Sequence, residues 1–158
     1  MASKGKGKSL WQESMRSGVP ELDEERRNVM ELLELLEVRP LCSVASDDFA
    51  SRFARVQAAT EKLFSHEEAL LLGRSLPLET KRLHLADHEK IRAILSRIGN
   101  DAARKKNQTA LDVYKSLRAA IERHVAKFGL DVTSGAAAAA PAGNAPARKT
   151  AAATSANA

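Results

Sequence analysis

Four segments of this chain space their apolar residues as the buried face of an α-helix requires. Within each segment, large apolar side chains recur every three or four positions, which places them on one stripe of a helix. Leu, Ala, Glu, Arg and Lys dominate the sequence, whereas the alternating β-branched runs that are typical of strands are missing. The spacing predicts an all-α protein with helices over residues 20–38, 47–73, 77–99 and 102–128.

Residues that end or begin helices separate these four segments. Pro40 ends the first segment, and Ser46 with the two acidic residues after it is typical of a helix start. Gly73 ends the second segment, residues 99–101 (Gly-Asn-Asp) separate the third from the fourth, and Gly129 closes the fourth. All three connections are short, and short connections join antiparallel neighbours. The sequence therefore predicts an antiparallel up-down-up-down four-helix bundle.

Both ends of the chain differ in composition from the predicted bundle. Residues 1–10 form a basic stretch, and residues 131–158 form a low-complexity run that is rich in Ala. Neither end offers many large apolar side chains to bury, so we expect a disordered N-terminal arm and a disordered Ala-rich C-terminal tail. The residues between them, 11–130, are numerous enough to form one domain with a hydrophobic core.

The net charge of +5 does not indicate a nucleic-acid-binding protein. Three of these charges lie in residues 1–10 and one more in residues 131–158, whereas nucleic-acid-binding domains cluster basic residues on a folded face. No apolar run approaches the ~20 residues that span a membrane, and the lone Cys42 fits a reducing compartment. We therefore expect a cytoplasmic protein with no membrane partner, and the sequence indicates no particular protein partner.

Ionisable residues interrupt the apolar stripe of every predicted helix. Arg26 lies near the start of the first helix, and Glu67 lies near the end of the second. The pair His84 and His88 lies near the start of the third helix, and His124 near the end of the fourth. In an antiparallel bundle all of these positions fall at the same end. We therefore expect the five side chains to meet in one buried layer, with a purely apolar core at the other end.

Buried ionisable groups cost several kcal/mol unless they are paired or bound to a metal, and two arrangements would meet that cost. One arrangement is a divalent metal ion held by His84, His88 and His124, with Glu67 as an oxygen ligand. Such a set of nitrogen and oxygen ligands suits iron or zinc. The other is a buried ion pair between Glu67 and Arg26, with neutral histidines in a hydrogen-bond network. The convergence of His124 and Glu67 on the His84/His88 layer favours the metal site.

Four stretches of the sequence, in order, resemble the motifs of the hemerythrin family, especially the single-domain bacteriohemerythrins. The resemblance covers about residues 11–130 and rests on Trp11 before SGVPELDEERRNVMELLELL, LFSHEEALL (63–71), HLADH (84–88) and ERHVAKFGLD (122–131). Members of the family hold two irons inside the bundle. The resemblance implies that His84, His88 and His124 match the three histidines of one iron, and that Glu67 matches a carboxylate that bridges both irons.

The sequence departs from the family at the ligands of the second iron, where O₂ binds. The positions of its two histidines are Arg26 and Leu63, and the position of the bridging Asp is Gly129, with Asp131 two residues late. His66 lies three residues beyond Leu63 and points elsewhere on the helix. The resemblance therefore implies one iron ion or none. We expect Arg26 to place a fixed positive charge near the vacated site and to pair with Glu67.

Three classes of function remain open from the sequence. The favoured one is a hemerythrin-like protein that binds one iron and is not a two-iron O₂ carrier; an oxygen-binding bacteriohemerythrin with a rearranged site is less favoured. The alternative is a metal-free helical bundle that serves as an interaction or sensory module. The third class, an enzyme, is the least favoured. Three histidines with an open position can hold a catalytic zinc, but the polar layer should be buried and no separate general base beside a substrate cleft is visible, so we expect no enzyme.

Overall fold

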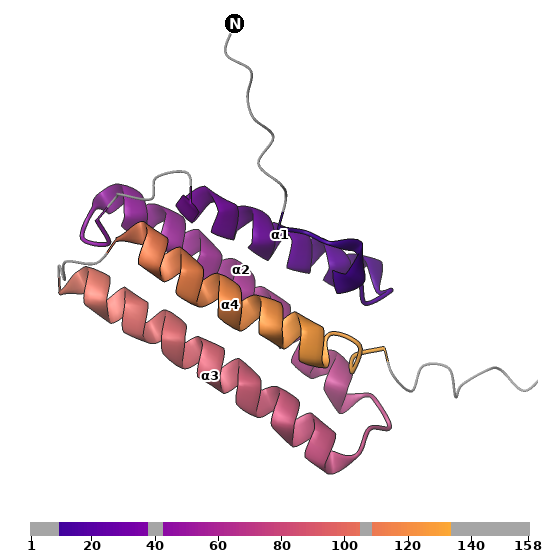
Figure 1. Cartoon of the computed structure of the whole chain (residues 1–158). Helices are drawn as coiled ribbons and strands as arrows, with labels where there is room; N and C mark the ends of the chain where they lie inside the picture. The colour runs from indigo at the N-terminus through magenta and orange to yellow at the C-terminus, as the bar shows by residue number, and fades with distance from the viewer. Residues whose placement is uncertain (1–9, 38–42, 105–108, 134–158) are drawn as a thin grey trace, which may run out of the picture.

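The computed structural model describes residues 10–37, 43–104 and 109–133. In these residues the chain forms four long α-helices that run antiparallel (Figure 1), and no strand beyond one isolated bridge between Ser43 and Thr109. Helix α1 packs against α2 and α4, and α3 packs against the same two helices. The predicted all-α, up-down-up-down bundle is confirmed. Its helices are α1 (Pro20–Glu37), α2 (Asp47–Leu72), α3 (Leu78–Ala103) and α4 (Ala110–Phe128), after a short 3₁₀ helix, η1 (Glu13–Met15).

Local side-chain contacts account for the starts of two of these helices. The Ser46 hydroxyl accepts a hydrogen bond from the Phe49 N–H at 3.1 Å, which caps α2 at the predicted place. The Thr109 hydroxyl accepts from the Asp112 N–H at 3.3 Å and caps α4. Pro40, which we expected to end the first helix, lies outside the described residues.

The predicted break at residues 99–101 is wrong. Helix α3 continues through these residues to Ala103, and α4 begins at Ala110 rather than at residue 102. Glycine inside a helix costs about 1 kcal/mol relative to alanine, but burial of neighbouring side chains offsets this cost. Ile98 is only 3% exposed, and Ala102 packs against the core. Tertiary packing therefore overrides the local preference of Gly99 and Asn100 to stop the helix.

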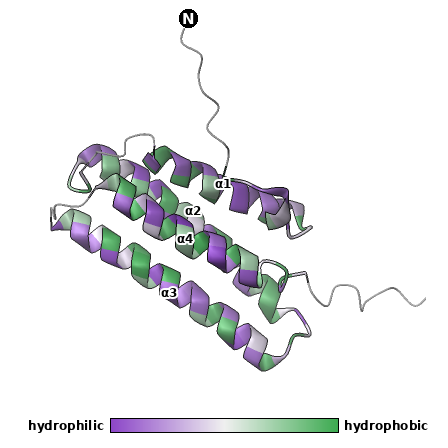
Figure 2. Cartoon of the chain, viewed as in Figure 1, coloured by the Kyte–Doolittle hydropathy of each residue, from purple (hydrophilic) through white to green (hydrophobic). Residues whose placement is uncertain are grey.

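The apolar stripes meet in a core that fills the bundle away from the ionisable layer. Figure 2 shows hydrophobic and hydrophilic residues interspersed along every helix, as expected for helices that bury one face. Leu33, Phe49, Val56, Ile91 and Leu117 are each at most 1% exposed. Among the described residues, the buried polar side chains are Ser17, Arg26, Thr60, Glu67, His84, His88 and His124.

Packing of the chain extends slightly beyond the expected domain limits of 11 and 130. Leu10 is 5% exposed, and Val132, in the turn after α4, is fully buried. Trp11 packs against the core as well, with the Arg27 guanidinium 5.0 Å from the centre of its ring. Residues 1–9 and 134–158 lie outside the described residues, so the predicted disorder of both ends stays a prediction. In the described part of the chain, no helix is long and apolar enough to cross a membrane.

Candidate metal centre

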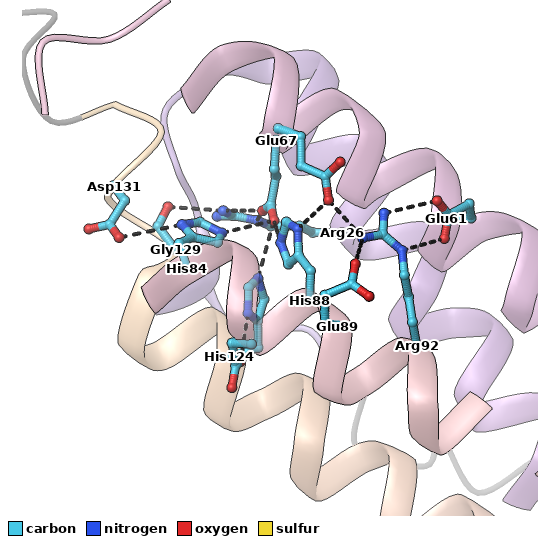
Figure 3. A network of polar contacts seen from close by, with 12 residues as sticks. Arg26, Glu61, Glu67, His84, His88, Glu89, Arg92, His124, Gly129 and Asp131 are labelled. Atoms are coloured by element: carbon cyan, nitrogen blue, oxygen red, sulfur yellow. Dashed lines mark hydrogen bonds and ion pairs between the residues drawn. The ribbon is translucent and has the colours of Figure 1, made fainter. Parts of the chain in front are cut away.

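Five ionisable side chains from all four helices meet inside one end of the bundle, as the topology predicts (Figure 3). Arg26 comes from the first half of α1, and Glu67 from the last turns of α2. His84 and His88 lie one turn apart in the first half of α3, and His124 lies near the end of α4. None of the five is more than 1% exposed. The predicted buried layer is confirmed.

One oxygen of Glu67 faces all three histidines. Its Oε2 lies 3.1 Å from Nε2 of His88, 3.2 Å from Nε2 of His124 and 3.5 Å from Nε2 of His84. One ligand atom from each of these four residues lies within 4.8 Å of every other. Glu67 and the three histidines thus form a compact, buried cluster that can hold a metal ion.

The separations between Glu67 and the histidines are close to the spacing of ligands around a single ion. Donor atoms bound ~2.0–2.1 Å from a tetrahedral ion lie about 3.3–3.4 Å from one another, and neighbouring donors of an octahedral ion about 3.0 Å apart. Two contacts of Glu67 Oε2, at 3.1 and 3.2 Å, fall in this range, and the third, at 3.5 Å, is slightly longer. The four donor atoms as a set lie within 4.8 Å of one another and would move closer together around one ion.

A carboxylate lies behind each histidine, on the side away from Glu67. Glu68 Oε1 is 2.9 Å from Nδ1 of His88, and Asp87 Oδ2 is 2.9 Å from Nδ1 of His124. Asp131 Oδ2 is 3.4 Å from Nδ1 of His84. An ionised carboxylate only accepts hydrogen bonds, so the rings of His88 and His124 can donate Nδ1–H to the outer carboxylates and Nε2–H to Glu67. A metal ion at the centre of the cluster would replace the Nε2 proton, and the Nδ1–H bond to the outer carboxylate would then remain.

His84 is the ring with no hydrogen bond of its own. It is fully buried, and neither of its nitrogens has a hydrogen-bond partner among the described residues, because its contacts to Glu67 and Asp131 are too long or poorly aligned. Its ring is held instead by apolar packing, stacked on Phe128 at a centroid distance of 4.9 Å. A buried imidazole without partners costs free energy. Nε2 of this ring could bind a cation at the centre of the cluster as a ligand.

The other oxygen of Glu67, Oε1, is hydrogen-bonded to Arg26. Oε1 accepts hydrogen bonds from the guanidinium Nη2 at 2.8 Å and Nε at 3.2 Å. The remaining guanidinium donors reach the carbonyl oxygens of Met15, at 3.1 Å, and Gly129, at 2.9 Å. The expected pairing of Arg26 with Glu67 is confirmed, and the guanidinium also ties the segment before α1 and the end of α4 to the buried layer.

Hydrogen bonds determine the charge of Glu67 in this environment. Its burial alone would raise the pKa of the carboxyl, since desolvation disfavours the charged form. Hydrogen bonds from the imidazole N–H groups of His124 and His88, with the ring of His84 close by, outweigh burial and hold the pKa of Glu67 well below its ordinary value. The carboxylate is therefore ionised at neutral pH and presents a negative charge to the centre of the cluster.

The positions matched to the second iron of the hemerythrin family carry no ligand. Leu63, one turn before Glu67 in α2, is a buried aliphatic residue. Gly129 has no room for any side chain, because a Cβ there would lie 2.3 Å from the carbonyl oxygen of Val125. His66 lies outside the cluster; its Nδ1 is 2.9 Å from Glu25, and its side chain is 31% exposed.

Sequence reasoning missed the outer carboxylates Glu68 and Asp87, and it noted Asp131 without giving it a role. All three lie beside the apolar stripes rather than on them. Two are adjacent in sequence to cluster residues, Glu68 to Glu67 and Asp87 to His88. Acidic residues next to buried histidines are a usable indication, because a metal-binding histidine commonly donates its other N–H to a carboxylate.

Comparison with protein-family models, with curated proteins and with solved structures found no match to this chain. The class of protein therefore rests on the fold and the site alone. The chain is an all-α four-helix bundle that contains a buried cluster of three histidines and one glutamate, able to hold a metal ion.

Proposed function

We propose that this protein is a hemerythrin-like bundle that binds one iron ion through His84, His88, His124 and Glu67. The observation that carries the proposal is the arrangement of donors around Glu67 Oε2, where the three Nε2 atoms lie at 3.1, 3.2 and 3.5 Å. With the Nδ1–H groups of His88 and His124 donated to outer carboxylates, loss of the Nε2 proton would turn both rings into metal ligands beside an ionised carboxylate. Such a set of donors would attract a cation.

Iron is the ion that the donor set and the sequence resemblance favour together. Imidazole nitrogens suit iron and zinc alike, and a carboxylate oxygen in the same set is common at non-haem iron. Iron held by this set would supply one-electron redox chemistry. The role of the protein's own residues is to bind the ion, to exclude water and to supply one negative charge through Glu67, since none of the four is more than 1% exposed.

Binding of one ion rather than two follows from Arg26. Its guanidinium already occupies Glu67 Oε1, the oxygen that would otherwise be available to a second cation. Leu63 and Gly129 offer no replacement ligand, and a side chain at residue 129 would collide with Val125. We therefore propose that the protein does not carry O₂ by two-iron chemistry. Nor do we expect an enzyme, because all four ligands are buried away from a substrate.

A metal-free interaction or sensory module is the second candidate. The observation that favours it is the Arg26–Glu67 ion pair, which compensates the buried carboxylate without any metal. Exposed leucines at the same end of the bundle, Leu72 at 78% and Leu78 at 81%, offer apolar surface beside the α2–α3 connection. On this alternative, removal of metal changes neither the melting temperature nor the optical spectrum.

Metal content after anaerobic purification with iron supplied tests the proposal. We expect about one iron per chain, lost in His88→Ala and His124→Ala and retained in the control His66→Ala, whose histidine lies outside the cluster. An optical spectrum before and after exposure to air then reports on redox chemistry. Two irons per chain with a reversible oxygen-dependent band would contradict the proposal, and a chain that retains no metal would support the metal-free module.

A further inference from the structure

The three carboxylates behind the histidines come from elements other than those of the rings they contact. Glu68 of α2 contacts His88 of α3, and Asp87 of α3 contacts His124 of α4. Asp131, in the turn after α4, contacts His84 of α3. Each contact therefore depends on how two elements pack. The ring orientations are fixed by the assembled bundle rather than by any one helix.

Each carboxylate can fix both the rotation of its ring and the position of the ring proton. An ionised carboxylate accepts the proton of Nδ1, and this leaves Nε2 as a lone-pair donor for a metal. If Nε2 carried the proton instead, a neutral ring could not bind an ion at the centre. The contacts of Glu68 and Asp87, at 2.9 Å, are shorter than those of Glu67 Oε2 to Nε2 of the same rings, at 3.1 and 3.2 Å, so they hold the Nδ1 proton when a metal ion replaces the proton on Nε2.

We propose that Glu68, Asp87 and Asp131 are positioning residues that hold the three histidines ready to bind metal, with Glu68 and Asp87 dominant. This inference rests on the proposed metal binding. This ranking of the three carboxylates follows from their distances to the histidines. Asp131 is 3.4 Å from His84, and its Oδ2 is buried without a hydrogen-bond partner among the described residues, so the ring must shift before the two can form a hydrogen bond. Loss of Asp131 should therefore weaken metal binding less than loss of either other carboxylate.

Helix α2 supplies a matched pair of variants for the test. Glu68 and Glu61 both accept hydrogen bonds from Arg92, at 2.9 Å for Glu68 and at 2.9 and 3.0 Å for Glu61, but of these two only Glu68 contacts a histidine. Glu68→Gln should weaken binding of Zn²⁺ and of anaerobic Fe²⁺ about 10–100-fold, the range seen for residues of this kind. Glu61→Gln should leave both affinities within about twofold.

Asp87→Asn provides a second variant and a readout that needs no metal. The amide of Asn can donate to Nδ1 of His124, which would move the ring proton to Nε2, as in catalytic triads whose Asp becomes Asn. In the metal-free protein, ¹H–¹⁵N correlations of the histidine rings should show Nδ1 of His124 protonated in the wild type, where Asp87 accepts this proton. In Asp87→Asn, Nδ1 should lose the proton and only Nε2, which faces Glu67, should keep one, together with about 10–100-fold weaker metal binding.

The outcomes separate this inference from the proposed function on which it rests. Failure of the wild type to bind either ion would contradict the proposed function, and the inference with it. Metal binding by the wild type that is unchanged in Glu68→Gln and Asp87→Asn, or equally weakened in Glu61→Gln, would overturn the inference alone. Urea unfolding identifies any variant that does not fold. If Glu68→Gln or Asp87→Asn is unfolded, the metal affinity of the other variant decides. An Asp131→Asn variant that binds metal more weakly than both Glu68→Gln and Asp87→Asn would refute the proposed order.

Discussion

Replacement of Arg26 by Met should strongly destabilise the metal-free protein, although it leaves the apolar packing volume nearly unchanged. The guanidinium is 1% exposed and makes two hydrogen bonds to Glu67 and one each to the carbonyls of Met15 and Gly129. Without it, the ionised Glu67 loses its buried counter-ion. Loss of one partner from a buried ion pair costs about 3–5 kcal/mol, which for a domain of this size lowers the melting temperature by about 10–20 °C.

Urea unfolding of four proteins measures this cost: wild type, Arg26→Met, Glu67→Gln and the double variant. Because the cost comes from an uncompensated charge, the double variant should recover most of the stability that Arg26→Met loses. Arg82→Met serves as the control, since the Arg82–Glu79 pair is exposed at 75% and 63% of its side chains and should contribute little.

Saturation with metal adds a second check on the same reasoning. A bound ion would provide positive charge to Glu67, so Arg26→Met should cost less in the metal-loaded protein than in the metal-free one. The reasoning would be refuted by a metal-free Arg26→Met protein within about 1 kcal/mol of the wild type. Destabilisation that is simply additive in the double variant would refute it as well, because the two side chains would then not be coupled.

Three further predictions concern the surroundings of the cluster. Metal affinity should fall as the pH falls, because protons compete with the ion for the imidazole nitrogens; a chelator competition across pH measures this, and a pH-independent affinity would contradict it. His66→Ala should leave metal affinity within about twofold and stability within about 1 kcal/mol, since the His66–Glu25 pair is partly exposed. Gly129→Ala should lower the free energy of unfolding by about 1–3 kcal/mol through overpacking, because its Cβ would lie 2.3 Å from the Val125 carbonyl oxygen; an unchanged urea midpoint would show that the turn relaxes freely.

The sequence was sufficient to predict the fold and the inner part of the site because both follow from helical spacing. Stripes of period 3.6 fix which face of each helix is buried, and short connections fix the direction of each helix. Together they placed Arg26, Glu67 and His124 at one end without any knowledge of three-dimensional contacts. The hydrogen bonds between Arg26 and Glu67 then follow from the chemistry of two opposite charges in one buried layer.

The outer carboxylates and the end of α3 were not predicted, for different physical reasons. Glu68 and Asp87 are partly buried beside the apolar stripes, where an acidic residue is ordinary, and their contacts with the histidines depend on how neighbouring helices pack. The end of α3 depends on a competition between local helix preference and tertiary packing. Gly99 and Asn100 favour a helix end locally, but the burial of Ile98 stabilises the continued helix. How much this burial stabilises the helix depends on the packed bundle and cannot be read from the local sequence.

The division of Glu67 between two kinds of positive group would allow the buried site to gain and lose an ion. Arg26 is attached to the chain and always compensates Oε1, so the carboxylate need not rely on a metal for its charge balance. Oε2 alone faces the histidines, and an exchangeable cation can act there. Small zinc domains differ, because their ligands have no other counter-ion and their folding depends on the metal. In this bundle the apolar core and Arg26 support the fold, and the metal would stabilise only the orientation of three rings.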